Sequence, residues 1–371
     1  MSEESTTIVQ ITEPEHKEKL LEFILEMKVQ NFPDVTFTEE QQNRFREITR
    51  ERIDKVMQTP YYTGFLLKVG DEYVSTCSIS LFYSCRQAQK SYYIHGLHTM
   101  PKHQGKGYRK QLIDYVINTH APENSVQGFT CQLHEMNLIG QELFEEFDFE
   151  PTCSNEFTLL YDILEESEED YSNRCKEMAR KDKLEFVQRL DEMKIKIPER
   201  PNFRFEEIHL RKDFEKKVGA LCEGNIFNIL DYTSEYMIDT DSLKHSFPVK
   251  SVFPELFRFF LMYEGETIVG CFFASSNLHI TNCNFRMFLR DIWVKKEYYK
   301  YKNFYLREVL NLIMETEILD KGRFWHLFIC KTFDEDVLNM LNAFKALDKG
   351  YDTWERYPDE EHTDEVGVLE D

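Results

Sequence analysis

Residues His103–Arg109 read His-Gln-Gly-Lys-Gly-Tyr-Arg, and this stretch decides the fold. It follows the strand-like run Tyr92–Met100 and leads into Tyr108–Asn118, where apolar residues recur at helical spacing. Glycines on both sides of Lys106 let backbone amides converge on an anion without an obstructing Cβ atom. The start of a helix adds unpaired N–H groups and positive dipole character. The sequence therefore predicts a cradle for a pyrophosphate group.

The same stretch resembles the acetyl-CoA loop of the GNAT superfamily of N-acetyltransferases, which reads Q/R-x-x-G-x-G/A. Gln104 and Gly107 match this pattern, whereas Arg109 stands where the family has a small residue. Pro101 lies three residues before Gln104, as in the family's V-x-P-x-x-Q/R-G run. Arg109 can still offer its amide to a phosphate, and its guanidinium adds a positive charge.

A second segment, Asn137–Phe149, resembles the family's N-x-x-A-x-x-L-Y-x-x-L-G-F segment. The residues that keep its spacing and character are Asn137, Gly140, Leu143, Phe144, Phe147 and Phe149, while Asp148 replaces the glycine. Two matching segments in the family's order are a more specific signal than one glycine-rich turn.

The resemblance implies an α/β (α+β) fold of the GNAT type, with a mixed central sheet flanked by helices. It also implies an acetyl-CoA-dependent enzyme in which an amine attacks the thioester directly. Coenzyme A would lie where the strand before the loop splays from the next strand. The residues expected to bind it are Leu97, His98, Thr99, Gln104, Gly105, Lys106, Gly107, Tyr108, Arg109, Asn137 and Phe144. For Asn137, helix capping explains the residue equally well.

Direct attack by an amine requires a group that accepts the proton of the resulting ammonium. The family often takes this base from the strand before the loop, and a period of two predicts Tyr93, His95 and Leu97 on one face. His95 is the predicted base because histidine has an unperturbed pKa of about 6.5, and Tyr93 is a weaker candidate. The alternative is a hydrogen-bonded strand histidine without a catalytic role.

A second group must protonate the departing thiolate. Phe144 stands where the family has its tyrosine, and phenylalanine cannot donate a proton, so we expect it to pack against the thioester arm. The proton would then come from water or another residue, with His134 a weak candidate. Cys131 could form an acyl-enzyme, but a buried strand thiol is the simpler interpretation.

The chain divides into two similar halves in this interpretation. Residues 1–163 form the catalytic domain, and 164–201 form an acidic and helical connector that ends in prolines. Residues 202–358 repeat the order of strands and helices, and 359–371 form an acidic tail. In the second half, Lys295–Leu306 occupies the place of the loop and contains no glycine. We therefore predict a degenerate GNAT-like domain that has lost cofactor binding.

Composition limits the classes of partner. The net charge of −22 over 371 residues argues against a nucleic-acid surface, which needs basic stripes. An acidic surface can attract cationic small molecules and basic protein segments, and the alternative is that the acidity only keeps the protein in solution. Nine cysteines without a C-x-x-C pair predict reduced thiols and no metal site. The N-terminus resembles no targeting signal and no apolar run reaches membrane length, which predicts a cytoplasmic protein, with the nucleus as an alternative.

The overall architecture resembles the fungal lysine N6-acetyltransferase family, which implies that the acceptor is the side-chain amine of free lysine. Two alternatives stay open at this point. The chain could acetylate protein amines and use its second half for docking. It could also be a non-catalytic module that binds coenzyme A, as Phe144 and Arg109 would allow. The oligomeric state and any contribution of the second half to the active site are left open by the sequence.

Overall fold

The structure of the chain is a computed structural model. It describes residues 5–31, 38–84, 89–126, 128–159, 168–209, 257–279, 284–319, 324–330, 334–344 and 347–356, with residues 213, 216, 217 and 221 and the segments 226–229 and 235–236 between them. The predicted acidic tail and the connector residues 164–167 lie outside these residues.

The first half contains the elements predicted around the glycine-rich loop. They are β1 (Thr6–Gln10), α1 (Pro14–Asn31), α2 (Glu39–Met57), β2 (Tyr62–Val69), β3 (Glu72–Ser84), β4 (Gln89–Thr99), η1 (Pro101–His103), α3 (Tyr108–Tyr115), η2 (Val116–His120), α4 (Ala121–Glu123), β5 (Gly128–His134), α5 (Leu138–Glu145) and β6 (Glu150–Leu159). Thr38 caps α2, because its hydroxyl accepts from the Gln41 amide and the Gln41 side chain accepts from the Thr38 amide.

The second half repeats this order after a long helix. Its elements are α6 (Glu168–Glu192), β7 (Phe203–Ile208), β8 (Ile226–Asn228), β9 (Glu235–Tyr236), β10 (Phe257–Glu264), β11 (Thr267–His279), β12 (Asn284–Lys295), η3 (Lys296–Tyr301), α9 (Lys302–Ile313), η4 (Met314–Leu319), β13 (Phe324–Cys330), α10 (Glu335–Ala343) and β14 (Leu347–Arg356). In both halves the helix after the loop ends in a π turn, η2 or η4. The mixed sheet flanked by helices, present twice, confirms the predicted fold class. Strand β14 was not predicted.

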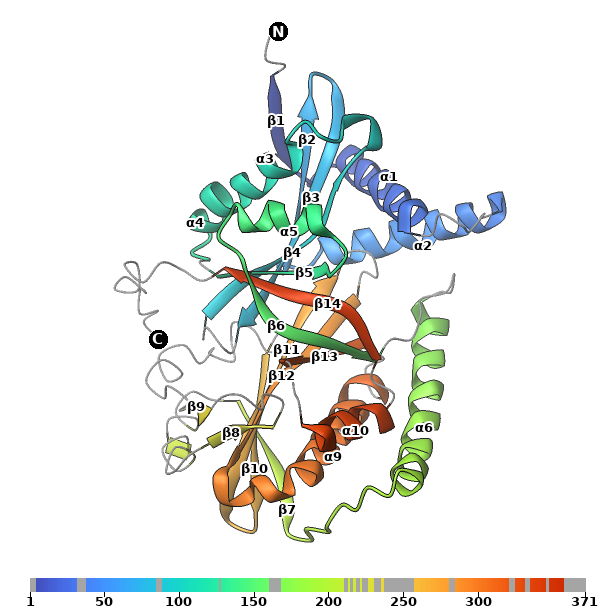
Figure 1. Cartoon of the computed structure of the whole chain (residues 1–371). Helices are drawn as coiled ribbons and strands as arrows, with labels where there is room; N and C mark the ends of the chain where they lie inside the picture. The colour runs from blue at the N-terminus through green and yellow to red at the C-terminus, as the bar shows by residue number, and fades with distance from the viewer. Residues whose placement is uncertain are drawn as a thin grey trace.

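All strands belong to one 14-stranded sheet whose main path is β1-β2-β3-β4-β5-β14-β6-β13-β12-β11-β10-β7. Read from its β7 end, the path gives the second-half counterparts of the first-half strands in the same order. β7 matches β1, β10 matches β2, and β6 matches β14. The symmetry also shows that the two halves trade their last strands. β14 pairs with β5 of the first half, and β6 pairs with β13 of the second half. Figure 1 shows β6 and β14 crossing the centre of the molecule between the halves.

Two apolar layers cover the sheet of the first half. Helices α1 and α2 pack through Leu20, Phe23 and Ile53 on one face, beside Leu66 of β2. Helices α3 and α5 pack on the opposite face through Leu112 and Phe144. Figure 1 shows these two groups of helices on opposite sides of β2–β4. The face under α1 and α2 is therefore separate from the face under α3 and α5.

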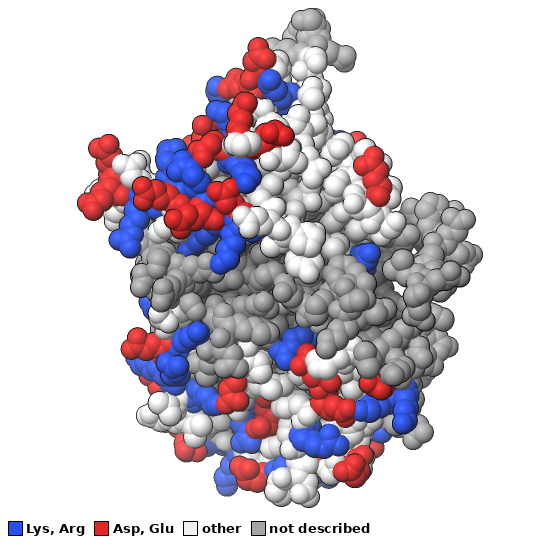
Figure 2. Space-filling view, turned by 180° about the vertical axis from the view of Figure 1, so that it is seen from behind, with Lys and Arg blue, Asp and Glu red and all other residues white. Residues whose placement is uncertain are grey.

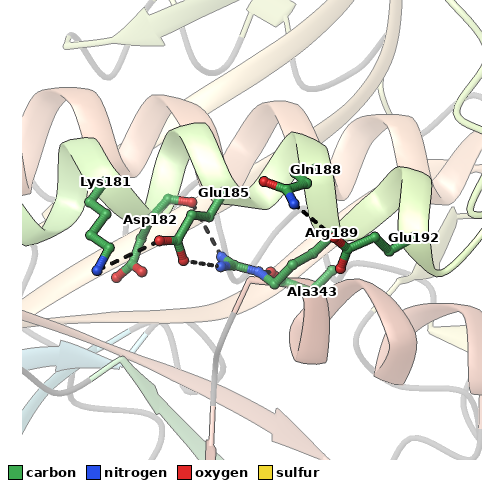
Figure 3. Close-up of polar contacts among 7 residues, drawn as sticks. All are labelled: Lys181, Asp182, Glu185, Gln188, Arg189, Glu192 and Ala343. Atoms are coloured by element: carbon green, nitrogen blue, oxygen red, sulfur yellow. Dashed lines mark hydrogen bonds and ion pairs between the residues drawn. The ribbon is translucent and has the colours of Figure 1, made fainter.

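Helix α6, predicted as a connector, packs into the core of the second half. Phe186 is buried there, and its ring meets that of Phe344 edge-on at 5.0 Å. The guanidinium of Arg189 donates to the Ala343 carbonyl at 2.5 Å, at the C-terminal end of α10, and to Glu185 at 2.8 Å (Figure 3). A cation at the end of a helix is favourable because the last carbonyls are unpaired. Packing thus groups α6 with the second half.

Charged side chains of both signs are intermixed over the face shown in Figure 2. On α1 and α2 they form ion pairs, with Lys17–Asp54 and Arg50–Glu18 each at 2.6 Å. In the described part of the chain, no helix combines the length and apolar character needed to cross a membrane. The same residues contain no group of three His, Cys, Asp or Glu side chains placed to hold a metal ion.

Arg189→Ala should lower the free energy of unfolding by about 1–3 kcal/mol, since it removes several hydrogen bonds of a half-buried cation. Urea denaturation followed by circular dichroism measures this loss. Gln188→Ala is the matched control, because Gln188 is exposed on the same helix and bonds only to Glu192 at 2.8 Å. Equal midpoints for the two variants would show that Arg189 does not anchor α6.

Candidate active site

The glycine-rich loop connects β4 to α3 through a single 3₁₀ turn. Gly105 and Gly107 have φ angles of +77° and +79°, and Gly107 is the N-cap of α3. A side chain is strained in this left-handed region, which explains why glycine stands at both positions. Nothing lies within 4 Å of a Cβ atom placed on either glycine. The Gln104 side chain closes the start of the loop by donating to the Thr99 carbonyl at 3.3 Å.

The loop presents positive charge and unpaired amides to this open space. Lys106 is exposed, Arg109 is half-buried, and neither has an ion-pair partner among the described residues. Tyr108 instead turns its ring into the core beside Leu112, so only its backbone belongs to the cradle. Helix α3 adds the positive end of its dipole. Open space, amides and cations at one helix start fit the diphosphate of coenzyme A.

Beside the loop, β4 and β5 stop pairing before either strand ends. Their parallel ladder runs from Ser91–Gly128 to Ile94–Cys131, although β4 continues to Thr99 and β5 to His134. The other edge of β4 remains paired with β3 up to Thr99. Residues Gly96–Thr99 of β4 therefore lie beyond the β4–β5 ladder, with a strand partner only on the β3 side among the described residues. This is the gap in which the pantetheine arm is expected, along Leu97, His98 and Thr99.

A β-bulge at Gly96 corrects the predicted side-chain pattern of β4. Gly96 has a φ angle of +61°, and the register shifts so that Ser78 opposes His95 whereas Thr76 opposes His98. An extra residue in one strand reverses the alternation beyond it. His95 and His98 consequently share the face under α1, where the His98 ring lies 6.1 Å from Phe23. The prediction that Leu97 shares the face of Tyr93 and His95 is wrong, because Leu97 packs on the opposite face.

The face that carries His95 is polar although it is buried. The Tyr62 and Ser78 hydroxyls hydrogen-bond at 2.7 Å, and the Tyr93 hydroxyl donates to the Gln132 side chain. The His95 ring lies 6.0 Å from the Tyr62 ring and 5.9 Å from the Tyr93 ring. Polar side chains are normally excluded from a sheet interior unless they are hydrogen-bonded or serve a function. We call Tyr62, Ser78, Ser80, Tyr93, His95, Thr130 and Gln132 the acceptor face.

Three polar atoms at or near this face are buried without a hydrogen-bond partner among the described residues: Ser80 Oγ, Thr130 Oγ1 and His98 Nε2. Burial lowers the pKa of His98, the charge of Glu26 partly offsets this, and the charge of Arg109 lowers the pKa further. His98 is thus held as a neutral imidazole near the expected pantetheine path.

The remaining predicted residues have structural contacts in this part of the chain. Asn137 is the N-cap of α5 and accepts from the Gly140 amide at 3.1 Å. Nδ1 of His134 accepts from the Met136 amide at 3.1 Å. Cys131 is buried in the apolar core. Phe144 is also buried, with its ring edge-on to Phe149 at 5.0 Å. Their proposed contacts with coenzyme A or with the proton remain predictions.

The second half has the same gap, but its own residues fill it. The β12–β13 ladder ends at Leu289–Leu327, as β4–β5 ends at Ile94–Cys131. Beyond that point β8 pairs with the free edge of β12, and the Ile229 amide donates to the Ile292 carbonyl at 2.7 Å. Lys302, which begins α9, forms a buried ion pair with Asp334, the N-cap of α10. The place equivalent to the cofactor gap is therefore occupied by protein.

The second half matches the acceptor face only in part: Ser275 and His326 hold the register positions of Ser80 and Thr130. Its strands place Phe257 and Phe273 at the register positions of Tyr62 and Ser78, and both phenylalanines belong to a buried apolar cluster. Sequence reasoning missed the polar positions Tyr62, Ser78, Ser80 and Thr130. The alternation of Ser78 and Ser80 along β3 was the available signal. In the second half, Phe273 stands at the position of Ser78.

The family model for the acetyltransferase (GNAT) family matches residues 21–149, from α1 to the residue before β6. The match includes the loop, the gap and the acceptor face. Residues 21–149 are therefore similar to the acetyltransferase domains of the GNAT family, whose cofactor is acetyl-CoA. No curated protein matched the sequence.

Solved structures with a similar fold are only distantly related. A tandem GNAT protein from the clavulanic acid biosynthesis pathway is 10% identical, over 95% of this chain and 98% of that chain, with a TM-score of 0.44. A probable N-acyltransferase from Enterococcus faecalis V583 is 9% identical, over 95% and 72%, with a TM-score of 0.40. Spermidine N-acetyltransferase from Vibrio cholerae, in complex with CoA and spermine, is 12% identical, over 43% and 88%, with a TM-score of 0.33.

Gly107→Glu should abolish binding of coenzyme A, because it places a carboxylate among amides that face a phosphate. Isothermal titration calorimetry with coenzyme A measures the affinity. Gly70→Glu is the matched control, since Gly70 also has a positive φ of +57° and open space at its Cβ but lies in the β2–β3 turn. The two variants carry similar backbone strain, and the control should bind like the unchanged protein.

The same titration should give one molecule of coenzyme A per chain, because β8 fills the second gap. Unchanged affinity in Gly107→Glu would refute the cradle. A second binding event in the unchanged chain, surviving in Gly107→Glu, would refute closure of the second half.

Proposed function

We propose that the chain transfers the acetyl group of acetyl-CoA to the side-chain amine of free lysine. The proposal is carried by the difference between the two halves. The first half has an open strand edge, with Tyr62 and Ser78 on its acceptor face. The second half has a filled gap, and Phe257 and Phe273 hold the register positions of these two residues. Buried polar groups destabilise a fold unless they are satisfied, so a polar face beside an open strand edge supports a role in binding and catalysis.

Acetyl-CoA, when bound, supplies an activated acetyl thioester. The loop at Gln104–Arg109 would hold its phosphates, and the unpaired edge of β4 would align its pantetheine arm. Backbone N–H groups at the Gly96 bulge are the donors available to polarise the carbonyl that the amine attacks. These groups are fixed by the pairing of β4 with β3, so they need no rearrangement during the reaction.

His95 would accept the proton that the attacking amine loses. Its ring lies on the acceptor face beside Tyr62 and Tyr93, just where β4 and β5 separate. An imidazole changes protonation near neutral pH and can pass a proton to water. Tyr93 is less suited, because its hydroxyl already donates to Gln132.

A small acceptor fits this site better than a protein segment. Ser78, Ser80, Thr130 and Tyr93 are almost completely shielded from solvent. A peptide would need an open groove for its own backbone, whereas a single amino acid can be enclosed. The net charge of −22 further favours approach of a cationic amine over an anionic one.

The proposal is tested by measuring release of the coenzyme A thiol from acetyl-CoA with L-lysine, polyamines and basic peptides. Lysine should give the highest kcat/KM. Preference for basic peptides would support acetylation of protein amines instead. Coenzyme A binding with no thiol release for any amine would refute catalysis and support a binding module.

His95→Ala should lower kcat for lysine at least tenfold while leaving the affinity for coenzyme A unchanged, since general-base catalysis contributes about 10²–10⁴-fold. The rate of the unchanged enzyme should fall in acid as His95 becomes protonated, and the variant should lose this part of the pH profile. If the His95→Ala variant has the same kcat and the same pH dependence of the rate as the unchanged enzyme, His95 is not the base.

A further inference from the structure

We propose that Ser80 and Thr130 form a subsite for the α-amino-carboxylate head of a basic amino acid, one strand repeat away from the reacting amine at His95. This inference rests on the proposed acetyl transfer and adds the residues that select the acceptor. It concerns the two hydroxyls of the acceptor face that the mechanism does not use.

The register places both hydroxyls beside Tyr93. Ser80 on β3 and Thr130 on β5 are each directly opposite Tyr93 on β4. Directly opposed residues share a face of a sheet, so the three side chains form a row under α1 and α2. Tyr62 on β2 opposes Ser80 and extends this row. In the other direction β14 follows, where Glu355 is opposite Thr130, so the second half supplies the next strand.

The hydroxyls of Ser80 and Thr130 are fully buried, and neither has a hydrogen-bond partner among the described residues. A buried hydroxyl without a partner destabilises a fold, because it has lost its hydrogen bonds to water. Two such groups, one on each side of Tyr93, are therefore better explained by a ligand that completes their bonds. A hydroxyl can donate to a carboxylate and accept from an ammonium group, which are the two charged groups of an amino-acid head.

The spacing matches the length of a basic side chain. Tyr93 and His95 are two residues apart, which is about 7 Å along a strand. Five bonds of about 1.5 Å join Cα of lysine to its side-chain nitrogen, and when extended they reach about 6 Å, close to this distance. An amine at His95 and a head group at the Ser80–Thr130 row are therefore compatible with one lysine molecule.

The test compares lysine with analogues that lack parts of the head. These are pentane-1,5-diamine without the carboxylate, 6-aminohexanoate without the α-amine, and pentylamine without both. In the double variant Ser80→Ala, Thr130→Val, kcat/KM for lysine should fall at least tenfold, the loss expected for hydrogen bonds to charged groups. For pentylamine it should change less than about twofold. Thr130→Ser, which keeps the hydroxyl, should retain the activity of the unchanged enzyme.

Ser275→Ala is the matched control, because Ser275 holds the register position of Ser80 in the second half and is also buried. It should leave all rates unchanged. Titration with coenzyme A shows that each variant is folded. If lysine and pentylamine lose activity in parallel, or lysine loses none, the subsite is refuted. If the unchanged enzyme acetylates none of these amines but acetylates a basic peptide, the proposed function itself fails.

Discussion

The exchange of β6 and β14 is the constraint on which the rest of the structure depends. Each half lacks the last strand of its own sheet and receives that strand from the other half. Strand β5, which forms one wall of the cofactor gap, is paired along its outer edge with β14. An unpaired edge exposes backbone groups to solvent or to other chains. The exchange removes this edge and makes the geometry of the catalytic half depend on the second half.

On this shared frame the two halves differ mainly at the gap. In both, the ladder to the next strand stops at the same point, as the repeat requires. The first half keeps glycines at the loop and a bulge at Gly96, which leaves backbone groups available to a ligand. The second half satisfies the equivalent groups with β8 and the Lys302–Asp334 pair. In the second half, β8 thus supplies the backbone hydrogen bonds at the edge of β12 that a ligand would otherwise make.

Features coded by short segments could be predicted from the sequence. The loop, the cap at Thr38 and the helix after Gly107 each depend on a few adjacent residues. The face of Leu97 was predicted wrongly because a period of two assumes a regular strand, and Gly96 interrupts it. Strand β14 and the exchange depend on pairing between distant residues, for which one sequence has no signal. Ser80 and Thr130 were missed because single hydroxyls in strands are ordinary until burial and missing partners are known.

The polar acceptor face explains why a non-catalytic half would be retained. Ser78 on this face contributes less apolar packing than Phe273, which holds the same register position in the second half. Active sites commonly depart from the best packing and rely on the surrounding structure for stability. Here the surrounding structure includes the apolar core of α6, α9 and α10, joined to β5 through β14. The second half can therefore stabilise a site to which its own loop contributes nothing.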